Sequence, residues 1–262
     1  MDTLSELRLR AERRDRAGAA AYLRAELDAG RLWRVSLLSD PALAPLWEDA
    51  ACRQVMEAAQ DRVAARAFRP EVLIEEAGEP GVRPLLLVLH GARSTAAATL
   101  PLWRPARELG YTVAAAQSSQ PATEDSFCWD PPRERVWQDL AAIAARLPAH
   151  GRVVLAGFSQ GAWIALQAAL RGQPFPATGA VMIGTFVGAI ANLEPASRRL
   201  RIAILNGGDD AYTESLGELR KDLSDRGHHV MVEVLPGLGH AYPDDFAARL
   251  PGLLKTVSRS AN

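Results

Sequence analysis

Short apolar runs alternate with helix-like stretches over most of the chain, and this alternation limits the fold more than any other feature. The runs begin at about residue 71 with "EVLIEE" and continue through "PLLLVLH", "YTVAAA", "RVVLAG", "GAVMIGT" and "RIAILNG" to "HVMVEVL". Stretches with helical spacing of apolar residues separate most of them, and residues 244–258 have the pattern of a closing helix. Continuous apolar strands between helices predict an α/β fold, with a mostly parallel sheet covered by helices on both faces.

The first 68 residues have a different pattern, without a convincing strand. Residues 4–30 place Leu and Ala at helical spacing among Arg and Glu, and a second helical stretch follows the helix-start signal "SDP". This second stretch resembles the last helix pair of certain tetratricopeptide-type repeats, but a lone repeat cannot bury its apolar face unaided. We therefore divide the chain into a helical segment, 1–68, and an α/β domain, 69–262. We expect the segment to pack on that domain, or to bind a partner protein or a second copy of the chain.

Composition and charge exclude several classes of protein. Apolar residues make up 48% and charged residues 23% of the chain, as in a folded protein rather than a disordered one. The formal net charge of −1 gives no reason to expect binding to nucleic acid. The charged first residues do not form a secretory signal, and the most apolar window, 179–193, is too short to span a bilayer. We therefore expect a cytoplasmic protein in which Cys52 and Cys128 are reduced thiols.

The pentapeptide "GFSQG", residues 157–161, stands at the junction between an apolar run and a helical stretch. A strand, G-x-S-x-G and a helix in this order are typical of a nucleophile elbow, a turn too tight for side chains at the glycine positions. Such a turn exposes the serine hydroxyl at the carboxyl end of the sheet. The pentapeptide also occurs by chance in loops, but its position here favours Ser159 as a catalytic nucleophile.

A serine nucleophile needs a general base within hydrogen-bond distance, and the chain has five histidines. His240 lies in a glycine-rich loop between the last strand and the closing helix, from which the imidazole can reach the serine. A surface loop histidine is the alternative. We expect three of the other histidines to lie at the surface, namely His150, His228 and His229.

An orienting carboxylate is expected at the end of the preceding strand, because it fixes the tautomer of the histidine and stabilises the imidazolium. The sequence after that strand contains Asp209 and Asp210 side by side. We favour Asp210, and Asp209 remains the alternative. Ser159, Asp210 and His240 then follow one another in an order unlike that of chymotrypsin or subtilisin.

Two backbone N–H groups are needed to stabilise the oxyanion of a tetrahedral intermediate. One candidate is the N–H of Gln160, which directly follows the serine at the start of a helix. The other is the N–H of Ala92, in the loop "HGARST" after an apolar strand, with Arg93 as the second choice. We expect His90 to hold this loop by hydrogen bonds rather than to act as a second base. The Arg93 side chain is expected either to meet an anionic part of a substrate or to be solvated.

The phrases "LHGARS", "GFSQG", "NGGDD" and "GLGHAYP" together resemble those of α/β-hydrolases. Over residues 71–258 the chain resembles the carboxylesterase/phospholipase group, which includes acyl-protein thioesterases and dienelactone-hydrolase-like enzymes. Members of this group often have His-Gly-Leu-Gly-Asp where this chain has "HGARST". The resemblance implies the α/β-hydrolase fold and a set of catalytic residues: Ser159 as nucleophile, Asp210 and His240 as its partners, and Ala92 and Gln160 as oxyanion donors.

Two connections at the carboxyl ends of strands are candidates for the substrate pocket, because long loops there often line such pockets. Residues 117–137 contain Phe127 and Trp129, which we expect to form an apolar wall, with core packing as the alternative for each. The connection "TFVGAIANLEPASRR" is expected to form a lid or rim, with Phe186 facing the site.

These residues predict a serine hydrolase that cleaves carboxylic esters of small or medium acyl groups through an acyl-enzyme. A thioesterase or a peptidase would use the same residues and remains an alternative. A binding or scaffold protein with a catalytically idle fold is the alternative of another class, and the complete set of three groups argues against it. Neither a cofactor nor a metal ion is expected, because the mechanism needs none. The expected partner is a small-molecule ester, with no nucleic acid and no membrane span.

Overall fold

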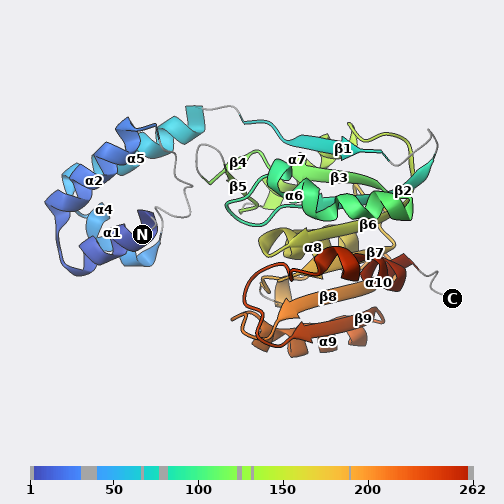
Figure 1. The fold of residues 1–262 in the computed structure, drawn as a ribbon. Coiled ribbons are helices and arrows are strands. Elements are labelled where there is room, and N and C mark those ends of the chain that lie inside the picture. The colour runs from blue at the N-terminus through green and yellow to red at the C-terminus, as the bar shows by residue number, and fades with distance from the viewer. Residues whose placement is uncertain are drawn as a thin grey trace.

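A seven-stranded sheet forms the centre of the larger part of the molecule (Figure 1). The computed structural model describes residues 3–30, 40–65, 68–76, 82–122, 126–130, 133–188 and 190–258. The strands of the sheet are β1 (Glu71–Glu75), β2 (Arg83–Leu89), β3 (Thr112–Gln117), β6 (His150–Phe158), β7 (Gly179–Ile183), β8 (Arg201–Gly207) and β9 (His229–Leu235). They lie side by side in the order β1-β3-β2-β6-β7-β8-β9. Every apolar run that the sequence predicts to be a strand is a strand of this sheet.

The sheet is parallel except at one edge. The strands from β3 across to β9 run parallel to their neighbours. β1 pairs with β3 in the antiparallel direction, with Glu71 opposite Gln117. The amino end of β1 therefore lies where the parallel strands end, and the N-terminal helices join the sheet on that side, as Figure 1 also shows.

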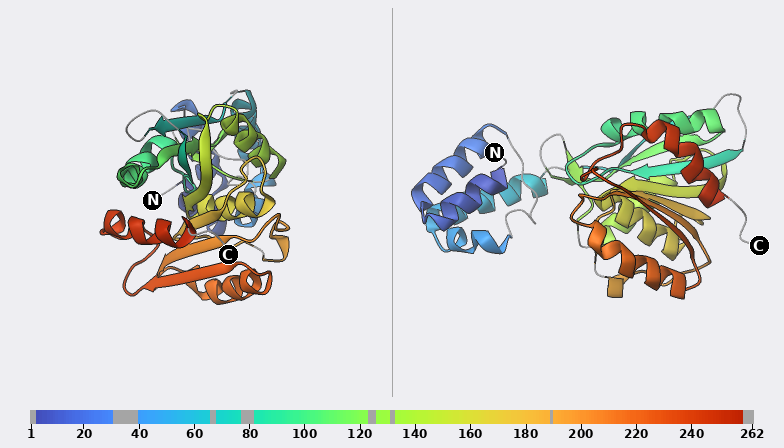
Figure 2. Two further views of the ribbon diagram at one scale, coloured as in Figure 1. Left: turned by 90° about the vertical axis from the view of Figure 1, so that its right-hand side faces the viewer. Right: turned by 60° about the horizontal axis from the view of Figure 1, so that its bottom comes forward.

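Helices cover both faces of the sheet, and each face has its own buried cluster (Figure 2). On one face lie α7 (Arg133–Ala144), α8 (Gln160–Arg171) and α9 (Leu216–Asp225), and on the other α6 (Ala96–Trp103) and α10 (Phe246–Ser258). In β2, Leu85, Leu87 and Leu89 belong to the first cluster. Leu86 and Val88 belong to the second. All five side chains are fully buried, which is why this strand is a continuous apolar run.

The N-terminal helices have a buried cluster of their own. They are α1 (Thr3–Glu12), α2 (Arg16–Asp28), η1 (Pro41–Leu43), α4 (Ala44–Trp47) and α5 (Ala50–Ala65). Leu7, Leu23 and Met56 are fully buried among these helices. The side chain of Asp40 accepts a hydrogen bond from the N–H of Ala42 and so caps η1, as the "SDP" signal predicts. The division of the chain at residue 68 stays a prediction, and residues 66–67 lie outside the described part.

The connection between β3 and α7 folds back onto the loop that follows β2. Within it, β4 (Gln120–Pro121) and β5 (Phe127–Cys128) form an antiparallel pair. Phe127 also exchanges two backbone hydrogen bonds with Ser94, of 3.0 and 3.4 Å. The connection therefore lies against the loop in which an oxyanion donor is expected. The remaining short segments are the 3-10 turns η2 (Arg104–Leu109), η3 (Ile190–Asn192) and η4 (Thr213–Ser215).

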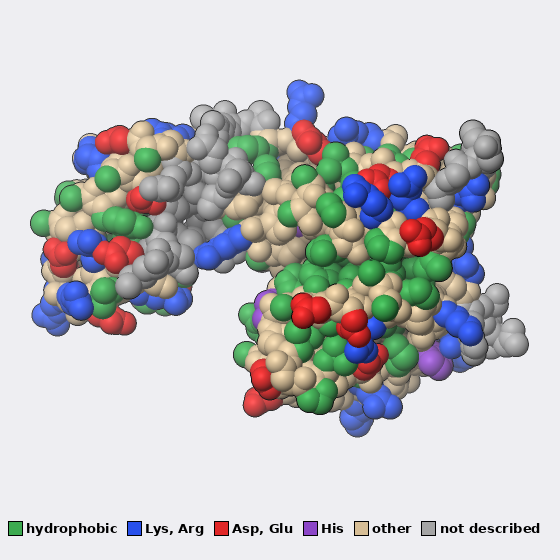
Figure 3. Space-filling view, in the orientation of Figure 1, with side chains coloured by type: hydrophobic (Ala, Val, Ile, Leu, Met, Phe, Trp, Pro, Cys, Tyr) green, Lys and Arg blue, Asp and Glu red, His purple; other side chains and the backbone are tan. Residues whose placement is uncertain are grey.

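Positive and negative side chains are interspersed over the face of the molecule seen in Figure 3. This distribution agrees with the net charge of −1. On this face, the coloured residues form no broad surface of one sign.

Candidate active site

Ser159 stands in a strained turn between the end of β6 and the start of α8. Its φ and ψ angles are 53° and −122°, a combination that residues with a side chain seldom adopt. In the described ranges only two other non-glycine residues have a positive φ, Arg14 and Arg93. Such a backbone conformation costs about 1–3 kcal/mol and occurs mostly at functional sites.

The two glycines around Ser159 are required by close backbone contacts. A Cβ atom on Gly161 would collide with the carbonyl oxygens of Leu89 and His90. A Cβ atom on Gly157 would collide with the backbone of Gly161 and Ala162. Backbone atoms cannot move aside as the end of a flexible side chain can. The elbow therefore packs directly on the end of β2, and no larger residue fits at either position.

Ser159, His240 and Asp210 form a chain of hydrogen bonds. Nε2 of His240 lies 2.8 Å from Oγ of Ser159, and Nδ1 lies 2.7 Å from Oδ2 of Asp210. Because a carboxylate only accepts, Nδ1–H donates to Asp210, and Nε2 accepts the hydroxyl proton of Ser159. Three loops, which follow β6, β8 and β9, bring these groups together. A serine nucleophile needs a contact with its base, and the base needs a contact with a carboxylate. Both contacts are present.

Asp210 is buried and has a donor at each carboxylate oxygen. Its side chain is 1% exposed, against 36% for His240. Oδ1 accepts the N–H of Tyr212 at 3.0 Å, while Oδ2 accepts Nδ1–H of His240. Of the two neighbouring acids, Asp210 is the one whose carboxylate contacts His240. Asp209 is exposed, and its backbone N–H donates to the carbonyl of Leu238.

The loop after β2 lies directly against the serine. A Cβ atom built on Gly91 would lie 3.6 Å from Cβ of Ser159. Ala92 and Arg93 follow in this loop, and both are exposed. Arg93 has a φ of 59°, a conformation that glycine adopts more easily. The loop that carries Ala92 and the residue after the serine, Gln160, thus lie next to Ser159, while their action on an oxyanion stays a prediction.

His90 is buried beneath this loop and is neutral. Because a carbonyl only accepts, Nδ1–H donates to the carbonyl of Gly91 at 2.8 Å, and Nε2 accepts the N–H of Ser118 at 3.3 Å. Burial lowers the pKa of His90 to about 4, since the charged imidazolium would lack hydration there. These bonds make His90 a structural link between the loop and the end of β3, in agreement with the sequence-based expectation.

Trp129 ties the connection between β3 and α7 to the elbow and is buried in the core. It is 2% exposed and belongs to a core cluster. Its backbone N–H donates to Oε1 of Gln160 at 2.7 Å, and its Nε1–H donates to the carbonyl of His90 at 3.0 Å. Nε2 of Gln160 in turn donates to Oδ1 of Asp130 at 3.0 Å. Core packing, the alternative that the sequence left open for Trp129, therefore describes it, and an exposed wall does not.

Phe127 and Phe186 are half-buried and remain candidates for the pocket. The ring of Phe127 packs edge-on against Phe68, with centroids 5.6 Å apart. The N–H of Phe186 donates to the carbonyl of Ser159 at 3.4 Å, and its ring meets that of Tyr212 edge-on. Sequence reasoning gives no reason to place Tyr212 at the site. The one available signal is its position two residues after the favoured acid.

His228 corrects an expectation, because it is buried rather than at the surface. It is 5% exposed, and its Nδ1 accepts the N–H of Leu200 at 3.1 Å. Burial also lowers the pKa of His228 below its usual value. His228 immediately precedes β9, at the opposite end of that strand from the loop that carries His240. It therefore has no place in the candidate site.

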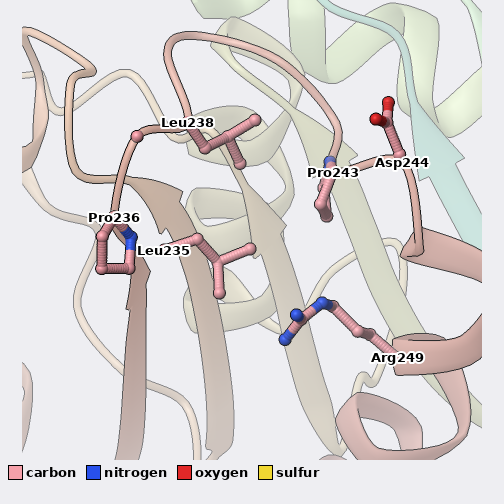
Figure 4. A pocket seen from close by; sticks show the side chains of 7 residues that line it. Leu235, Pro236, Leu238, Pro243, Asp244 and Arg249 are labelled. Carbon is pink, nitrogen blue, oxygen red and sulfur yellow. The ribbon is translucent and has the colours of Figure 1, made fainter.

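A groove of about 410 Å³ opens beside the loop that carries His240 (Figure 4). It is lined by Leu235, Pro236, Gly237, Leu238, Pro243, Asp244 and Arg249. Arg249 there forms ion pairs with Glu233 and Asp245, each of 2.7 Å. None of the three hydrogen-bonded site residues lines this groove, so it does not hold the reactive atoms.

Two kinds of feature are absent from the described ranges. No group of three or more His, Cys, Asp or Glu side chains there is placed to hold a metal ion. In the same ranges, no helix has the length and apolar character needed to cross a membrane.

The order of the strands and the positions of these residues define the fold. A mostly parallel sheet between helices, with a serine elbow after β6, an acid after β8 and a histidine after β9, is the α/β-hydrolase fold. Solved structures agree with this assignment. An uncharacterized protein from Bacillus cereus ATCC 10987 is 21% identical with a TM-score of 0.63, over 99% of this chain and 89% of its own. That coverage includes the N-terminal helices.

Two named esterases match a smaller share of this chain. Esterase PE8 is 20% identical with a TM-score of 0.63, over 72% of this chain and 99% of its own. A carboxylesterase from Bacillus cereus is 18% identical with a TM-score of 0.56, over 71% of this chain and 94% of its own. No protein-family model and no curated protein matches the sequence. Likeness at these identities establishes a shared fold and not a shared reaction.

Proposed function

We propose that the chain is a serine hydrolase that cleaves carboxylic esters of small or medium acyl groups through an acyl-enzyme. The observation that carries the proposal is the hydrogen-bond chain from Asp210 through His240 to Oγ of Ser159. The strained elbow at Ser159 supports it, because backbone strain of this kind is rarely kept without a functional reason. The names of two structural neighbours, an esterase and a carboxylesterase, favour the same chemistry.

In the first half of the reaction, Oγ of Ser159 attacks the carbonyl carbon of the ester. Nε2 of His240 takes the hydroxyl proton as the new C–O bond forms. The tetrahedral intermediate then collapses, the bond to the alcohol oxygen breaks, and His240 gives its proton to that oxygen. Asp210 stabilises the imidazolium that exists between these two transfers and holds the tautomer that accepts from serine.

In the second half, water takes the place of the alcohol. His240 removes a proton from the water, the hydroxide oxygen attacks the acyl carbon, and the proton returns to Oγ of Ser159 as the acid leaves. The N–H groups of Ala92 and Gln160 are proposed to donate to the oxyanion in both halves. The mechanism uses no group beyond these and water, so the proposal includes neither a cofactor nor a metal ion.

Turnover of p-nitrophenyl acetate and butyrate by wild type and Ser159→Ala tests the proposal. We expect wild type to release p-nitrophenol and the variant to lose about 10⁵- to 10⁶-fold in kcat, as when a triad serine is removed elsewhere. Near-normal turnover by Ser159→Ala would refute the assignment. No turnover by wild type would favour the catalytically idle alternative. Parallel assays with thioesters and peptides decide between ester hydrolysis and the thioesterase and peptidase alternatives.

The N-terminal helices are proposed to bind a partner protein or a second copy of the chain. Their separate buried cluster supports a role apart from the sheet, and the neighbours named as esterases cover only 72% and 71% of this chain. The cytoplasmic location expected from the sequence stays a prediction.

A further inference from the structure

Two aromatic rings meet beside His240. The ring centroids of Phe186 and Tyr212 are 5.3 Å apart at an interplanar angle of 84°, and the Tyr212 ring lies 5.4 Å from the imidazole of His240. Tyr212 is 37% exposed, and in the described ranges it is the only aromatic residue among the exposed large apolar side chains. Aromatic side chains commonly line ligand sites, so an exposed ring next to reactive atoms is a candidate binding contact. We call these two rings, Phe186 and Tyr212, the aromatic corner.

The main chain fixes the aromatic corner to the reactive residues. The N–H of Phe186 donates to the carbonyl of Ser159 at 3.4 Å. The N–H of Tyr212 donates to Oδ1 of Asp210 at 3.0 Å. Both side chains therefore start from positions set by the triad itself. Replacing either ring leaves these backbone bonds available, so the rings can be tested apart from the hydrogen-bond chain.

The order of the strands places the aromatic corner away from the oxyanion loop. Ser159 follows β6, whose neighbours in the sheet are β2 on one side and β7 on the other. Ala92 follows β2, whereas Phe186 follows β7 and Tyr212 follows β8. An ester whose carbonyl oxygen points toward Ala92 therefore has one of its two other substituents on the side of the corner.

We propose that the aromatic corner is a subsite for an aromatic group in the acyl or the alcohol part of the substrate. The inference rests on the proposed function. Two rings at nearly a right angle offer a third ring both a face and an edge, and aromatic groups prefer these contacts. A saturated chain would gain only from burial of apolar area, which discriminates weakly between groups of similar size.

Two matched pairs of esters test the subsite. The acyl pair is p-nitrophenyl phenylacetate and p-nitrophenyl cyclohexylacetate, and the alcohol pair is benzyl acetate and cyclohexylmethyl acetate. Cyclohexyl is at least as apolar as phenyl, so burial alone gives no preference for the aromatic member. For wild type we expect kcat/KM to favour the aromatic member of at least one pair by about two- to tenfold, the size of an aromatic pair contact.

Four variants test whether that preference depends on the rings of Phe186 and Tyr212. Tyr212→Leu and Phe186→Leu are expected to bring the ratio of kcat/KM values close to one. Tyr212→Phe keeps the ring and is expected to keep the ratio. Tyr22→Leu, in α2 of the N-terminal helices, is the matched control and is expected to leave the ratio unchanged.

The outcomes distinguish a failure of the subsite proposal from a failure of the proposed function. Equal kcat/KM values within both pairs would overturn the subsite, and so would a preference that survives both leucine variants. Hydrolysis of p-nitrophenyl acetate is measured in the same experiment. If Ser159-dependent turnover of that ester is present, the proposed function stands whichever way the ratio falls. If it is absent, the proposed function fails and the subsite fails with it.

Discussion

Replacing Asp210 with asparagine tests the hydrogen-bond chain by changing one atom. The carboxylate accepts two N–H groups, one from His240 at 2.7 Å and one from the backbone of Tyr212 at 3.0 Å. Asparagine has nearly the same shape but only one oxygen acceptor, and its NH₂ group donates. One of the two N–H groups must therefore lose its acceptor in Asp210→Asn.

The burial of the site decides which contact survives. If the amide oxygen turned to His240, the NH₂ group would face the N–H of Tyr212, and two donors would meet at a position that is 1% exposed. That arrangement costs about 1–3 kcal/mol. The oxygen therefore stays with Tyr212, and the NH₂ group donates to Nδ1 of His240. The imidazole proton moves to Nε2, which then cannot accept the proton of Ser159.

We expect kcat of Asp210→Asn to fall by about 10⁴-fold, as for the same change in a serine protease triad, which is about 5–6 kcal/mol of transition-state stabilisation. Initial rates of p-nitrophenyl acetate hydrolysis over a range of pH measure the loss. Asp209→Asn is the matched control and is expected to stay within about twofold, since that exposed side chain is not the one in contact with His240. A loss of less than tenfold in Asp210→Asn, or a larger loss in Asp209→Asn, would refute the reasoning.

Other changes probe the elbow, the buried histidine and the helices. Gly161→Ala should abolish turnover because its Cβ meets backbone carbonyls, whereas Gly217→Ala, in open space on α9, should add about 0.5–1 kcal/mol to the free energy of unfolding. Both are read by p-nitrophenyl acetate rates and denaturant melts. Because burial lowers the pKa of His90 to about 4, its contribution to stability is complete above pH 6.5 and is lost as pH falls toward 4. Measured by denaturant melts, the free energy of unfolding of wild type should fall by about 3 kcal/mol over that pH range relative to that of His90→Gln. Deleting residues 1–65 should leave kcat/KM on p-nitrophenyl acetate unchanged, because those helices have their own buried cluster; loss of folding would contradict this.

The strands could be predicted from the sequence because a parallel sheet buries both faces of each strand. β3, for example, is buried over its whole length, and such a strand has to be an uninterrupted apolar run. The glycines at 157 and 161 could be interpreted for a similar reason, since the tight turn imposes a residue type at fixed spacing. The direction of β1 could not be predicted, because its pairing with β3 depends on a partner far away in the chain.

Side-chain positions outside such constraints were harder to predict. Trp129 lies in a long connection, and its inward position goes with hydrogen bonds to Gln160 and His90 and with packing in a core cluster. The sequence gives no sign of those bonds. His228 and His229 are adjacent, and one is buried while the other is exposed. The buried one precedes β9 and accepts the N–H of Leu200, a contact that the sequence does not indicate. Tyr212 is held at the site by the hydrogen bond from its backbone N–H to Asp210. Any residue other than proline can donate that bond, so the sequence does not indicate it.

Covalent labelling with a fluorophosphonate probe tests directly whether Ser159 is an activated nucleophile. The probe reacts with serine hydroxyls that a neighbouring base activates, and mass spectrometry of the digested protein locates the adduct. We expect one adduct per chain, on the peptide that contains Ser159, and none in Ser159→Ala. His240→Ala should slow the labelling sharply, because Oγ then lacks its proton acceptor at 2.8 Å. No adduct on wild type, or an adduct of equal yield on Ser159→Ala, would show that Ser159 is not the nucleophile.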